Sequence, residues 1–289
     1  MHLIDIPGTE RALEGIKAEI LDCAFPTIVD VKCFTKYSEA FDNVEFNFLN
    51  GAKSSKLGEE RASLLDANGK IFVDTGKAIN DHAHPNCRTV VVGNPANTNA
   101  LLCANHAPRI PRENFTALTR LDQNRSYWQL AKKIGVTVND IDKIAIWGNH
   151  SSTMYPDLRN ATSKGKKITS LVSQEWREGE FIDTIRHRFQ RIIELRGISS
   201  AASAGNSATD HMRDWVLGSD HWQSIAFYTD GKHYGIPEGL MFSMPCTSAG
   251  GKYKVVEGID VDDEFTQKAL KITTEDLLKE RRAVEHLMR

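Results

Sequence analysis

Two residues in the middle of the chain have the types and the spacing for chemistry on a small organic acid. Asp122 and Arg125 lie three positions apart in a stretch that predicts a helix, so both side chains leave the same helix face. An arginine offers paired donors that match the two oxygens of a carboxylate, which makes Arg125 a candidate substrate anchor. The same spacing also fits an exposed ion pair, which would contribute little.

His150 adds a group that can carry a proton. It follows an apolar stretch that predicts a strand, and strand ends in α/β sheets often present functional groups to a crevice. A carboxylate such as that of Asp122, bonded to one ring nitrogen, would fix the tautomer and leave the other nitrogen free to transfer a proton. An isolated histidine in this place is also a common structural residue, so only its pairing with Asp122 favours catalysis.

Three other strand ends carry residues that could face a ligand. Asp5 follows the first apolar stretch, where an acidic side chain can accept hydrogen bonds from ribose hydroxyls, although helix caps look the same. Asn94 follows the β-branched stretch 89–93 and suits either a turn or a contact in the crevice. Gly51 marks a place where the backbone could approach a ligand closely.

The elements that must position these residues alternate between strand and helix in the first part of the chain. The predicted strands cover 2–6, 29–34, 44–49 and 89–93, and the predicted helices cover 9–23 and 59–83. This alternation predicts βαβ units on a parallel sheet, as in a doubly wound nucleotide-binding domain. We place this domain at residues 1–118.

The rest of the chain, residues 119–289, predicts an α+β domain. Its predicted helices cover 121–134, 181–195, 199–217 and 274–288, and its predicted strands cover 143–147, 225–228, 240–245 and 253–256. Gly135 is a natural C-terminal cap for the first of these helices, and Thr274 is a candidate N-terminal cap for the last. The short strands are separated by turn residues, which favours antiparallel pairing.

The composition excludes several classes of function. The 36 basic and 38 acidic residues are mixed along the chain, so nothing indicates binding to nucleic acid or to an anionic membrane. Five cysteines without a C-x-x-C pair predict neither a disulfide framework nor a zinc site, and the spacing of His82 and His84 is better explained by a surface loop than by a metal. No signal peptide and no apolar run of about 18 residues is present, so we expect a cytoplasmic protein.

Long runs around the candidate residues resemble one known family. Residues 92–99, 114–122 and 146–152 are similar to the lactate/malate dehydrogenase family, in particular to its cytosolic type of NAD-dependent malate dehydrogenases. The resemblance extends from residues 3–7 to residues 255–258 and so covers nearly the whole chain. It implies hydride transfer between NAD(H) and malate or oxaloacetate, a reaction of the tricarboxylic acid cycle, on a Rossmann-type sheet followed by a catalytic domain.

The resemblance also implies a role for each candidate residue. His150 matches the proton carrier, Asp122 its orienting partner, and Arg125 the arginine that pairs with the substrate's C1 carboxylate. The remaining matches are the ribose-binding acid Asp5, the cofactor contact Gly51, and Asn94 on the nicotinamide side, where it contacts both cofactor and substrate. Family members form dimers or tetramers, so a homodimer is expected.

The chain departs from the family pattern in its first strand and glycine-rich turn. Both should precede His2, and the turn is where the family binds the pyrophosphate on a helix N-terminus. The strand lies centrally in a sheet of order 3-2-1-4-5-6, so an incomplete sheet split into two parts is expected.

A second departure is in the loop that closes over the substrate in the family. Of the two arginines in that pattern, the stretch 51–61 retains only Arg61, as a substrate-binding candidate. The other arginine position falls at Ser55, beside Lys56, and lysine supplies charge without the paired donors of arginine.

Three functions therefore remain open from the sequence. A malate dehydrogenase-like oxidoreductase is favoured by Asp122, Arg125 and His150. A catalytically weak or inactive homologue that acts by dimerisation or protein interaction is favoured by the missing turn and Ser55. A dehydrogenase for another 2-hydroxy acid, with a single carboxylate, is permitted by Ser55.

Overall fold

The chain begins with a small parallel unit. The computed structural model describes residues 1–53 and 61–288, without the side chains of 61–64. The first elements are β1 (His2–Ile4), α1 (Glu10–Asp22), β2 (Lys32–Phe34) and α2 (Tyr37–Ala40). β1 and β2 pair in parallel, with Leu3 opposite Cys33, and form a two-stranded sheet of their own. The predicted order of strand, helix and strand is confirmed here.

The next elements form the second parallel unit. They are β3 (Phe46–Leu49), α3 (Arg61–His82), β4 (Arg88–Val91), α4 (Ala96–Asn105) and β5 (Phe115–Leu118). β4 lies between β3 and β5 and pairs in parallel with both. Val90 and Val91 of β4 are fully buried, as the continuous β-branched stretch predicts for a strand covered on both faces.

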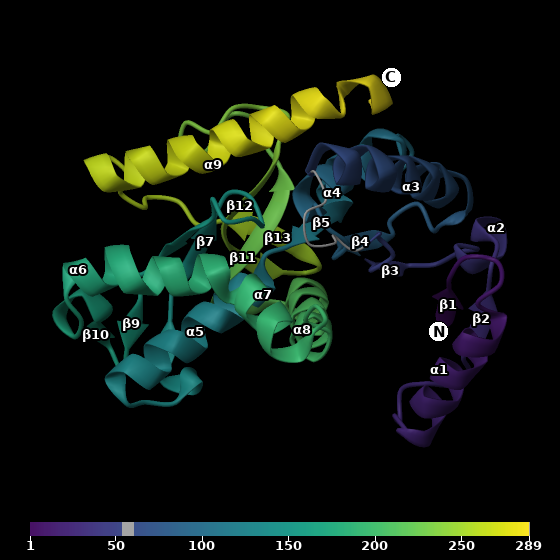
Figure 1. Cartoon of the computed structure of the whole chain (residues 1–289), viewed down its shortest axis with the longest axis horizontal. Helices are drawn as coiled ribbons and strands as arrows, with labels where there is room; N and C mark the ends of the chain where they lie inside the picture. The colour runs from purple at the N-terminus through teal and green to yellow at the C-terminus, as the bar shows by residue number, and fades with distance from the viewer. Residues whose placement is uncertain (54–60, 289) are drawn as a thin grey trace.

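The two parallel units do not share a sheet. β1 and β2 stand apart, while β3 is the edge strand of a six-stranded sheet of order β13-β12-β11-β5-β4-β3. Phe46 and Phe48 of this edge strand are exposed. Figure 1 shows the N-terminal unit, in purple, as a lobe away from α5, α7 and α9. The predicted split of the sheet is therefore confirmed.

The C-terminal strands extend the same sheet in the antiparallel sense. They are β11 (Ser219–Tyr228), β12 (Met241–Ala249) and β13 (Lys252–Val255). The predicted antiparallel pairing is confirmed, since β12 pairs antiparallel with both β11 and β13. β11 also pairs antiparallel with β5, with Ile225 opposite Leu118. The sheet thus runs without a break across the chain position at which we placed the domain boundary.

Three helices and a two-stranded ribbon lie between β5 and β11 in the chain. α5 (Arg120–Ile134) begins directly after β5 and ends, as predicted, at Gly135 in the left-handed conformation with φ 70°. The ribbon consists of β7 (Ala145–Trp147) and β8 (Tyr155–Asp157), and the other two helices are α7 (Ile182–Arg196) and α8 (Ala202–Leu217). Short elements connect them: β6 (Ile141–Asp142), β9 (Thr162–Ser163), β10 (Lys166–Lys167) and α6 (Gln174–Trp176).

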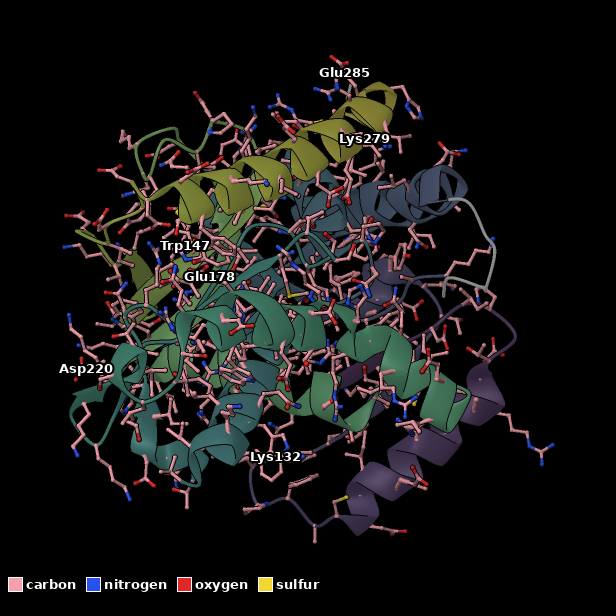
Figure 2. The ribbon with its side chains drawn as sticks, turned by 60° about the vertical axis from the view of Figure 1, so that its left-hand side comes forward. Lys132, Trp147, Glu178, Asp220, Lys279 and Glu285 are labelled. Atoms are coloured by element: carbon pink, nitrogen blue, oxygen red, sulfur yellow. The ribbon has the colours of Figure 1, made fainter. Side chains whose placement is uncertain are left out.

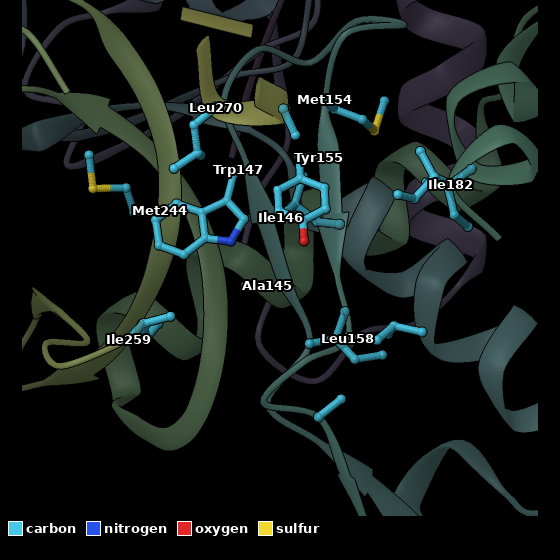
Figure 3. Packing of buried hydrophobic residues seen from close by; sticks show 14 of the residues in the cluster. Ala145, Ile146, Trp147, Met154, Tyr155, Leu158, Ile182, Met244, Ile259 and Leu270 are labelled. Atoms are coloured by element: carbon cyan, nitrogen blue, oxygen red, sulfur yellow. The ribbon is translucent and has the colours of Figure 1, made fainter. Parts of the chain in front are cut away.

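The largest core lies around β7. Ile146 and Trp147 are fully buried, and Figure 3 shows them among side chains of β8, β12, α7 and α9 such as Tyr155, Met244 and Leu270. The indole nitrogen of Trp147 donates to Asp157 Oδ2 at 3.2 Å, so its polar atom is satisfied. In Figure 2 Trp147 lies inside the molecule, whereas charged residues such as Lys132, Lys279 and Glu285 lie at its surface. This packing fixes the strand that leads to His150.

The last helix is longer than the sequence predicted. α9 runs over Glu264–Ala283, so the predicted start at Thr274 is wrong. Its N-terminal cap is Asp263, whose side chain accepts a hydrogen bond from the backbone nitrogen of Thr266. Buried residues then recur at helical spacing along one face, at Thr266, Ala269, Leu270, Thr273, Leu277 and Glu280.

Candidate active site

Asp122 and His150 lie in direct contact. α5 presents Asp122 from its first turn, and the chain that leaves β7 at Trp147 presents His150 three residues later. His150 Nδ1 is 2.5 Å from Asp122 Oδ2, a short hydrogen bond. The carboxylate is fully buried and the imidazole side chain is 14% exposed. A proton on Nδ1 therefore faces the carboxylate, and Nε2 is the ring nitrogen left for a substrate.

Arg125 shares the same carboxylate. Its Nη1 lies 3.3 Å from Asp122 Oδ1, and its Nη2 lies 3.4 Å from Ser200 Oγ. The arginine side chain is only 8% exposed, so the alternative of an exposed ion pair is wrong. Burial lowers the pKa of Arg125, and the negative charge of Asp122 opposes that shift. A largely desolvated guanidinium is a strong anchor for an anion, because little water screens it.

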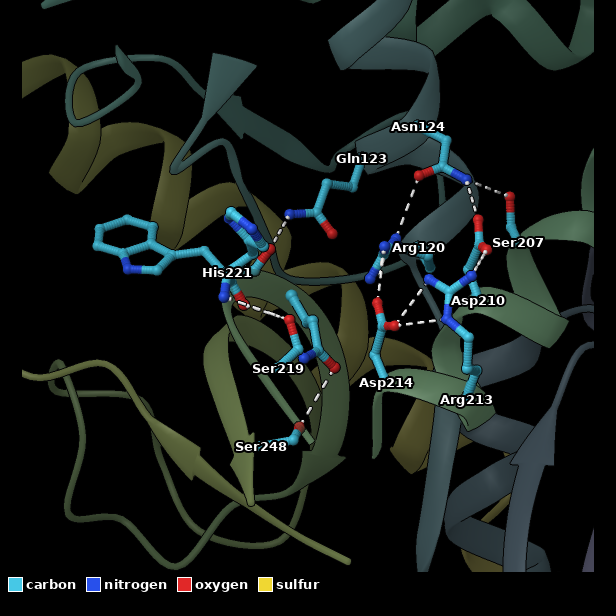
Figure 4. A network of polar contacts seen from close by, with 12 residues as sticks. Arg120, Gln123, Asn124, Ser207, Asp210, Arg213, Asp214, Ser219, His221 and Ser248 are labelled. Carbon is cyan, nitrogen blue, oxygen red and sulfur yellow. Dashed lines mark hydrogen bonds and ion pairs between the residues drawn. The ribbon is translucent and has the colours of Figure 1, made fainter. Parts of the chain in front are cut away.

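Neighbouring polar contacts hold α5 in place. The amide of Gln123 donates to the carbonyls of Ile144 and Trp222 at 2.8 Å and 2.9 Å, and its oxygen accepts from Ser224 N at 2.9 Å. This buried side chain ties the first turn of α5 to the residue before the ribbon and to β11. On the outer side of the helix, Figure 4 shows Arg120 and Asn124 of α5 bonded to the α8 residues Asp214, Ser207 and Asp210.

Asn97 holds the segment that carries His150. It lies fully buried on α4, where its Oδ1 accepts from His150 N at 3.0 Å. Its amide nitrogen donates to the carbonyls of Met241 and Gly148, at 2.8 Å and 3.3 Å. Sequence reasoning did not assign Asn97 a role. The one sequence signal for Asn97 was its place in the stretch 92–99, which resembles the lactate/malate dehydrogenase family.

Gly148 is required by a close approach of α9. Its φ is +90°, and a Cβ built there would lie 2.1 Å from Thr273 Oγ1. The same hydroxyl accepts a hydrogen bond from Asn149 N at 2.8 Å. Only glycine allows the helix and the segment before His150 to come this close.

The cofactor candidates Gly51 and Asn94 follow neighbouring strands. Gly51 comes after β3 and Asn94 after β4, and Asn68 of α3 links the two strand ends. Its Oδ1 accepts from Lys53 N at 2.7 Å, while its Nδ2 donates to Asn94 O at 2.8 Å. Asn94 is exposed, and among the described residues nothing lies within 4 Å of a Cβ built at Gly51, so these residues leave room for a ligand.

Asp5 lies on the separate two-stranded sheet, beyond the end of β1. Its side chain is exposed, and its Oδ1 accepts from Ile6 N at 2.8 Å. An exposed carboxylate at a strand end can accept hydrogen bonds from vicinal hydroxyls, and the open space at Gly51 suits a close backbone approach. Asp5 and Gly51 therefore fit the ribose hydroxyls and a close backbone contact of a dinucleotide. The structure does not join Asp5 to the Asp122 and His150 pair by any described contact.

The roles predicted for the residues of the loop that closes over the substrate in the family remain predictions. Arg61 is the first residue of α3, and its side chain lies outside the described part of the chain. Ser55 and Lys56 also lie outside the described residues.

Residues 1–53 and 61–288 contain neither a cluster of metal-binding side chains nor a membrane-spanning helix. In those ranges no group of three or more His, Cys, Asp or Glu side chains is placed to hold a metal ion. No helix there is long and apolar enough to cross a membrane.

Comparison with known proteins matches the whole chain to one family. Residues 1–116 match the model of the lactate/malate dehydrogenase NAD binding domain, and residues 119–288 match that of the lactate/malate dehydrogenase alpha/beta C-terminal domain. A malate dehydrogenase of Rubrobacter xylanophilus is 48% identical over 288 residues, which cover 99% of this chain and 88% of the relative. A probable malate dehydrogenase of Dictyostelium discoideum is 47% identical, over 97% of this chain and 86% of its own.

Solved structures agree with that assignment. Malate dehydrogenase from Naegleria fowleri has a TM-score of 0.94 and 41% identity, over 99% of this chain and 87% of its own. Lactate dehydrogenase from Trichomonas vaginalis, solved with NADH and oxamate, has a TM-score of 0.93 and 37% identity, over 99% of this chain and 89% of its own. The chain therefore belongs to the lactate/malate dehydrogenase family of NAD-dependent oxidoreductases.

Proposed function

We propose that the protein catalyses reversible hydride transfer between NAD(H) and malate or oxaloacetate. The observation that carries this proposal is the shared carboxylate of Asp122, which holds a proton-carrying histidine and an anion-binding arginine side by side. Malate is favoured over other 2-hydroxy acids because curated relatives at 45–48% identity are malate dehydrogenases.

The residues of the chain account for the proton and for substrate orientation. Arg125 pairs with the C1 carboxylate of oxaloacetate and so directs the C2 carbonyl oxygen toward His150 Nε2. NADH, when bound, would supply a hydride to C2. His150 donates the Nε2 proton to the carbonyl oxygen, which becomes the hydroxyl of malate, and the reverse reaction returns that proton to Nε2. Asp122 stabilises the imidazolium and keeps its orientation throughout.

Four residues would hold the remaining groups. Asp5 would accept hydrogen bonds from the ribose hydroxyls of NAD, while Gly51 and Asn94 would contact the cofactor, with Asn94 also at the substrate. Arg61, the loop arginine that the chain retains, would contribute positive charge toward the substrate.

We also propose a homodimer in the cytoplasm. The resemblance to dimeric family members supports association, and Trp128 of α5 supports it too, because this large apolar side chain is 60% exposed. It stands beside a cavity of about 240 Å³ between α5, α7 and α8. The five free cysteines support a reducing compartment. Sedimentation of the wild type and of Trp128→Glu tests the dimer, and a wild-type monomer would refute it; cell fractionation tests the location.

The activity is tested by NADH binding and by turnover. NADH fluorescence should change on binding, and NADH should be oxidised faster with oxaloacetate than with pyruvate. Faster turnover of pyruvate would replace the proposal by a dehydrogenase for a monocarboxylate. Absence of both binding at millimolar NADH and turnover would favour the inactive, interacting homologue instead.

A further inference from the structure

One face of the C-terminal helix supports the segment that carries His150. Thr273, Asp276 and Glu280 are spaced three and four residues apart on α9, so their side chains leave the same helix face. Thr273 and Glu280 are buried and Asp276 is partly buried. All three bond to residues 149–153, and none of them has a part in the chemistry proposed above.

Asp276 makes most of these bonds with a single oxygen. Its Oδ2 accepts from Asn149 Nδ2 at 2.9 Å, from Ser151 Oγ at 2.8 Å and from Thr153 Oγ1 at 2.9 Å. Asn149 and Ser151 are the two chain neighbours of His150. The carboxylate of Asp276 therefore holds the side chains on both sides of His150 in the chain.

The other two residues of the face complete the attachment. Besides the bond from Asn149 N to Thr273 Oγ1, the Asn149 amide donates to Glu280 Oε1 at 2.9 Å. Glu280 Oε2 in turn accepts from Thr98 Oγ1 at 2.5 Å. Thr98 lies on α4 next to Asn97, which accepts from His150 N. The segment is thus held between α9 and α4.

A carboxylate suits this place better than a neutral side chain. Hydrogen bonds to an ionised acceptor are roughly twice as strong as neutral ones, and three donors converge here on one oxygen. An asparagine at 276 would keep one acceptor oxygen, but its own amide donors would face the donors of Asn149. Catalytic groups must be held within roughly 0.5 Å, and a misplacement of about 1 Å can cost roughly 100-fold in rate.

We propose that Asp276 is a positioning residue for proton transfer by His150. It acts through Asn149, Ser151 and Thr153 and touches neither substrate nor cofactor. Asp122 orients the imidazole ring, whereas Asp276 places the backbone from which the ring projects. The inference rests on the proposed function in assigning the proton transfer to His150.

Kinetics of Asp276→Ala and Asp276→Asn test this role, with Glu275→Ala as the matched control. Glu275 is the preceding residue on α9, and its side chain is largely exposed. Asp276→Ala should lower kcat with oxaloacetate roughly 10- to 100-fold and leave the Kd for NADH within about twofold. Asp276→Asn should lower kcat by a smaller factor than Asp276→Ala. The isotope effect on kcat with deuterated NADH should rise in both, because the chemical step becomes rate-limiting, while Glu275→Ala should match the wild type.

A merely structural role gives a different result. If kcat falls only in proportion to the folded fraction measured by circular dichroism, with the isotope effect unchanged, the proposal is overturned. An unchanged kcat in Asp276→Ala, or an equal loss in Glu275→Ala, would overturn it as well.

A readout that needs no activity separates this inference from the proposed function. The proton between His150 Nδ1 and Asp122 gives a low-field NMR resonance, assigned by its loss in His150→Gln. It should shift or broaden in Asp276→Ala and remain in Glu275→Ala. A wild type without turnover would refute the proposed function, yet this resonance would still decide the positioning role, because an unaltered signal in Asp276→Ala would refute that role.

Discussion

His150 and Asp122, 28 residues apart in the chain, share a 2.5 Å hydrogen bond whose carboxylate is fully buried. We expect Asp122→Asn to lower kcat about 10³- to 10⁴-fold, because an amide holds the wrong tautomer and cannot stabilise the imidazolium. The measurement is NADH oxidation with oxaloacetate, and the Kd for NADH serves as the control for an intact fold. A loss of less than tenfold would remove Asp122 from this role.

Arg125→Lys tests the anion anchor. Lysine keeps the charge but not the planar paired donors, and the loss of one charged hydrogen bond is worth about 1.5–3 kcal/mol, or roughly 10- to 100-fold. We expect kcat/KM for oxaloacetate to fall by that factor with NADH affinity unchanged. Arg188→Lys is the matched control, since Arg188 lines the same cavity between α5 and α7. Equal effects of the two changes would contradict the assignment of Arg125.

Gly148→Ala tests the close approach of α9 to the strand end. The alanine would meet Thr273 Oγ1 at 2.1 Å and would also adopt a φ of +90°. Gly135 has a φ of +70°, and no described atom lies within 4 Å of a Cβ built there, so it is a control for the cost of the left-handed backbone conformation alone. We expect a loss of about 1–2 kcal/mol in Gly135→Ala and of about 3–4 kcal/mol in Gly148→Ala, measured by urea unfolding. Similar losses of stability in the two variants would show that the Thr273 side chain can move aside at little cost.

His211 makes stability depend on pH. It is buried between α8 and β5, with Nε2 3.1 Å from Thr116 Oγ1. Burial, and then the charge of Arg120, lowers the pKa of His211 to about 3 from its ordinary value of 6.5. Below pH 6.5 this histidine binds a proton in the unfolded chain, whereas in the folded protein it stays neutral until the pH approaches 3. The contribution of neutral His211 to the free energy of unfolding is therefore fully present above pH 6.5. It is lost as the pH decreases toward 3, by about 2 kcal/mol between pH 7 and pH 5.

Urea unfolding of His211→Gln at the two pH values checks this effect. The variant should lose about 2 kcal/mol less than the wild type between pH 7 and pH 5, whatever its stability at pH 7. His221→Gln is the control, because His221 is exposed. The same pH dependence in His211→Gln as in the wild type would contradict the prediction.

Local sequence patterns predicted the elements that carry the two reacting side chains. α5, with its cap at Gly135, and β7, which leads to His150, follow from periodicity and turn residues alone. The start of α9 was wrong because Thr274 resembles a cap, while the true cap, Asp263, lies eleven residues earlier. α4 was not predicted as a helix, since it is buried on nearly all sides and so lacks an amphipathic pattern.

The supports of the site could not be predicted in the same way. Asn97 bonds to His150 across 53 residues, and Thr273 bonds to Asn149 across 124 residues. Periodicity reports which residues share a face within one element, and it carries no information on which elements meet. The split of the parallel sheet was predicted only through the family resemblance, because no local pattern indicates the order of strands.

β5 pairs with β4 on one side and with β11 on the other, so the strand that leads to Asn94 and the antiparallel strands against which the His150 segment packs belong to one sheet. Two halves joined in this way cannot swing apart about a hinge, because swinging would break the ladder between β5 and β11. We therefore expect the six-stranded sheet to melt as a single cooperative unit. Any movement that admits a ligand must then come from segments that lie off the sheet, and not from a separation of the two halves.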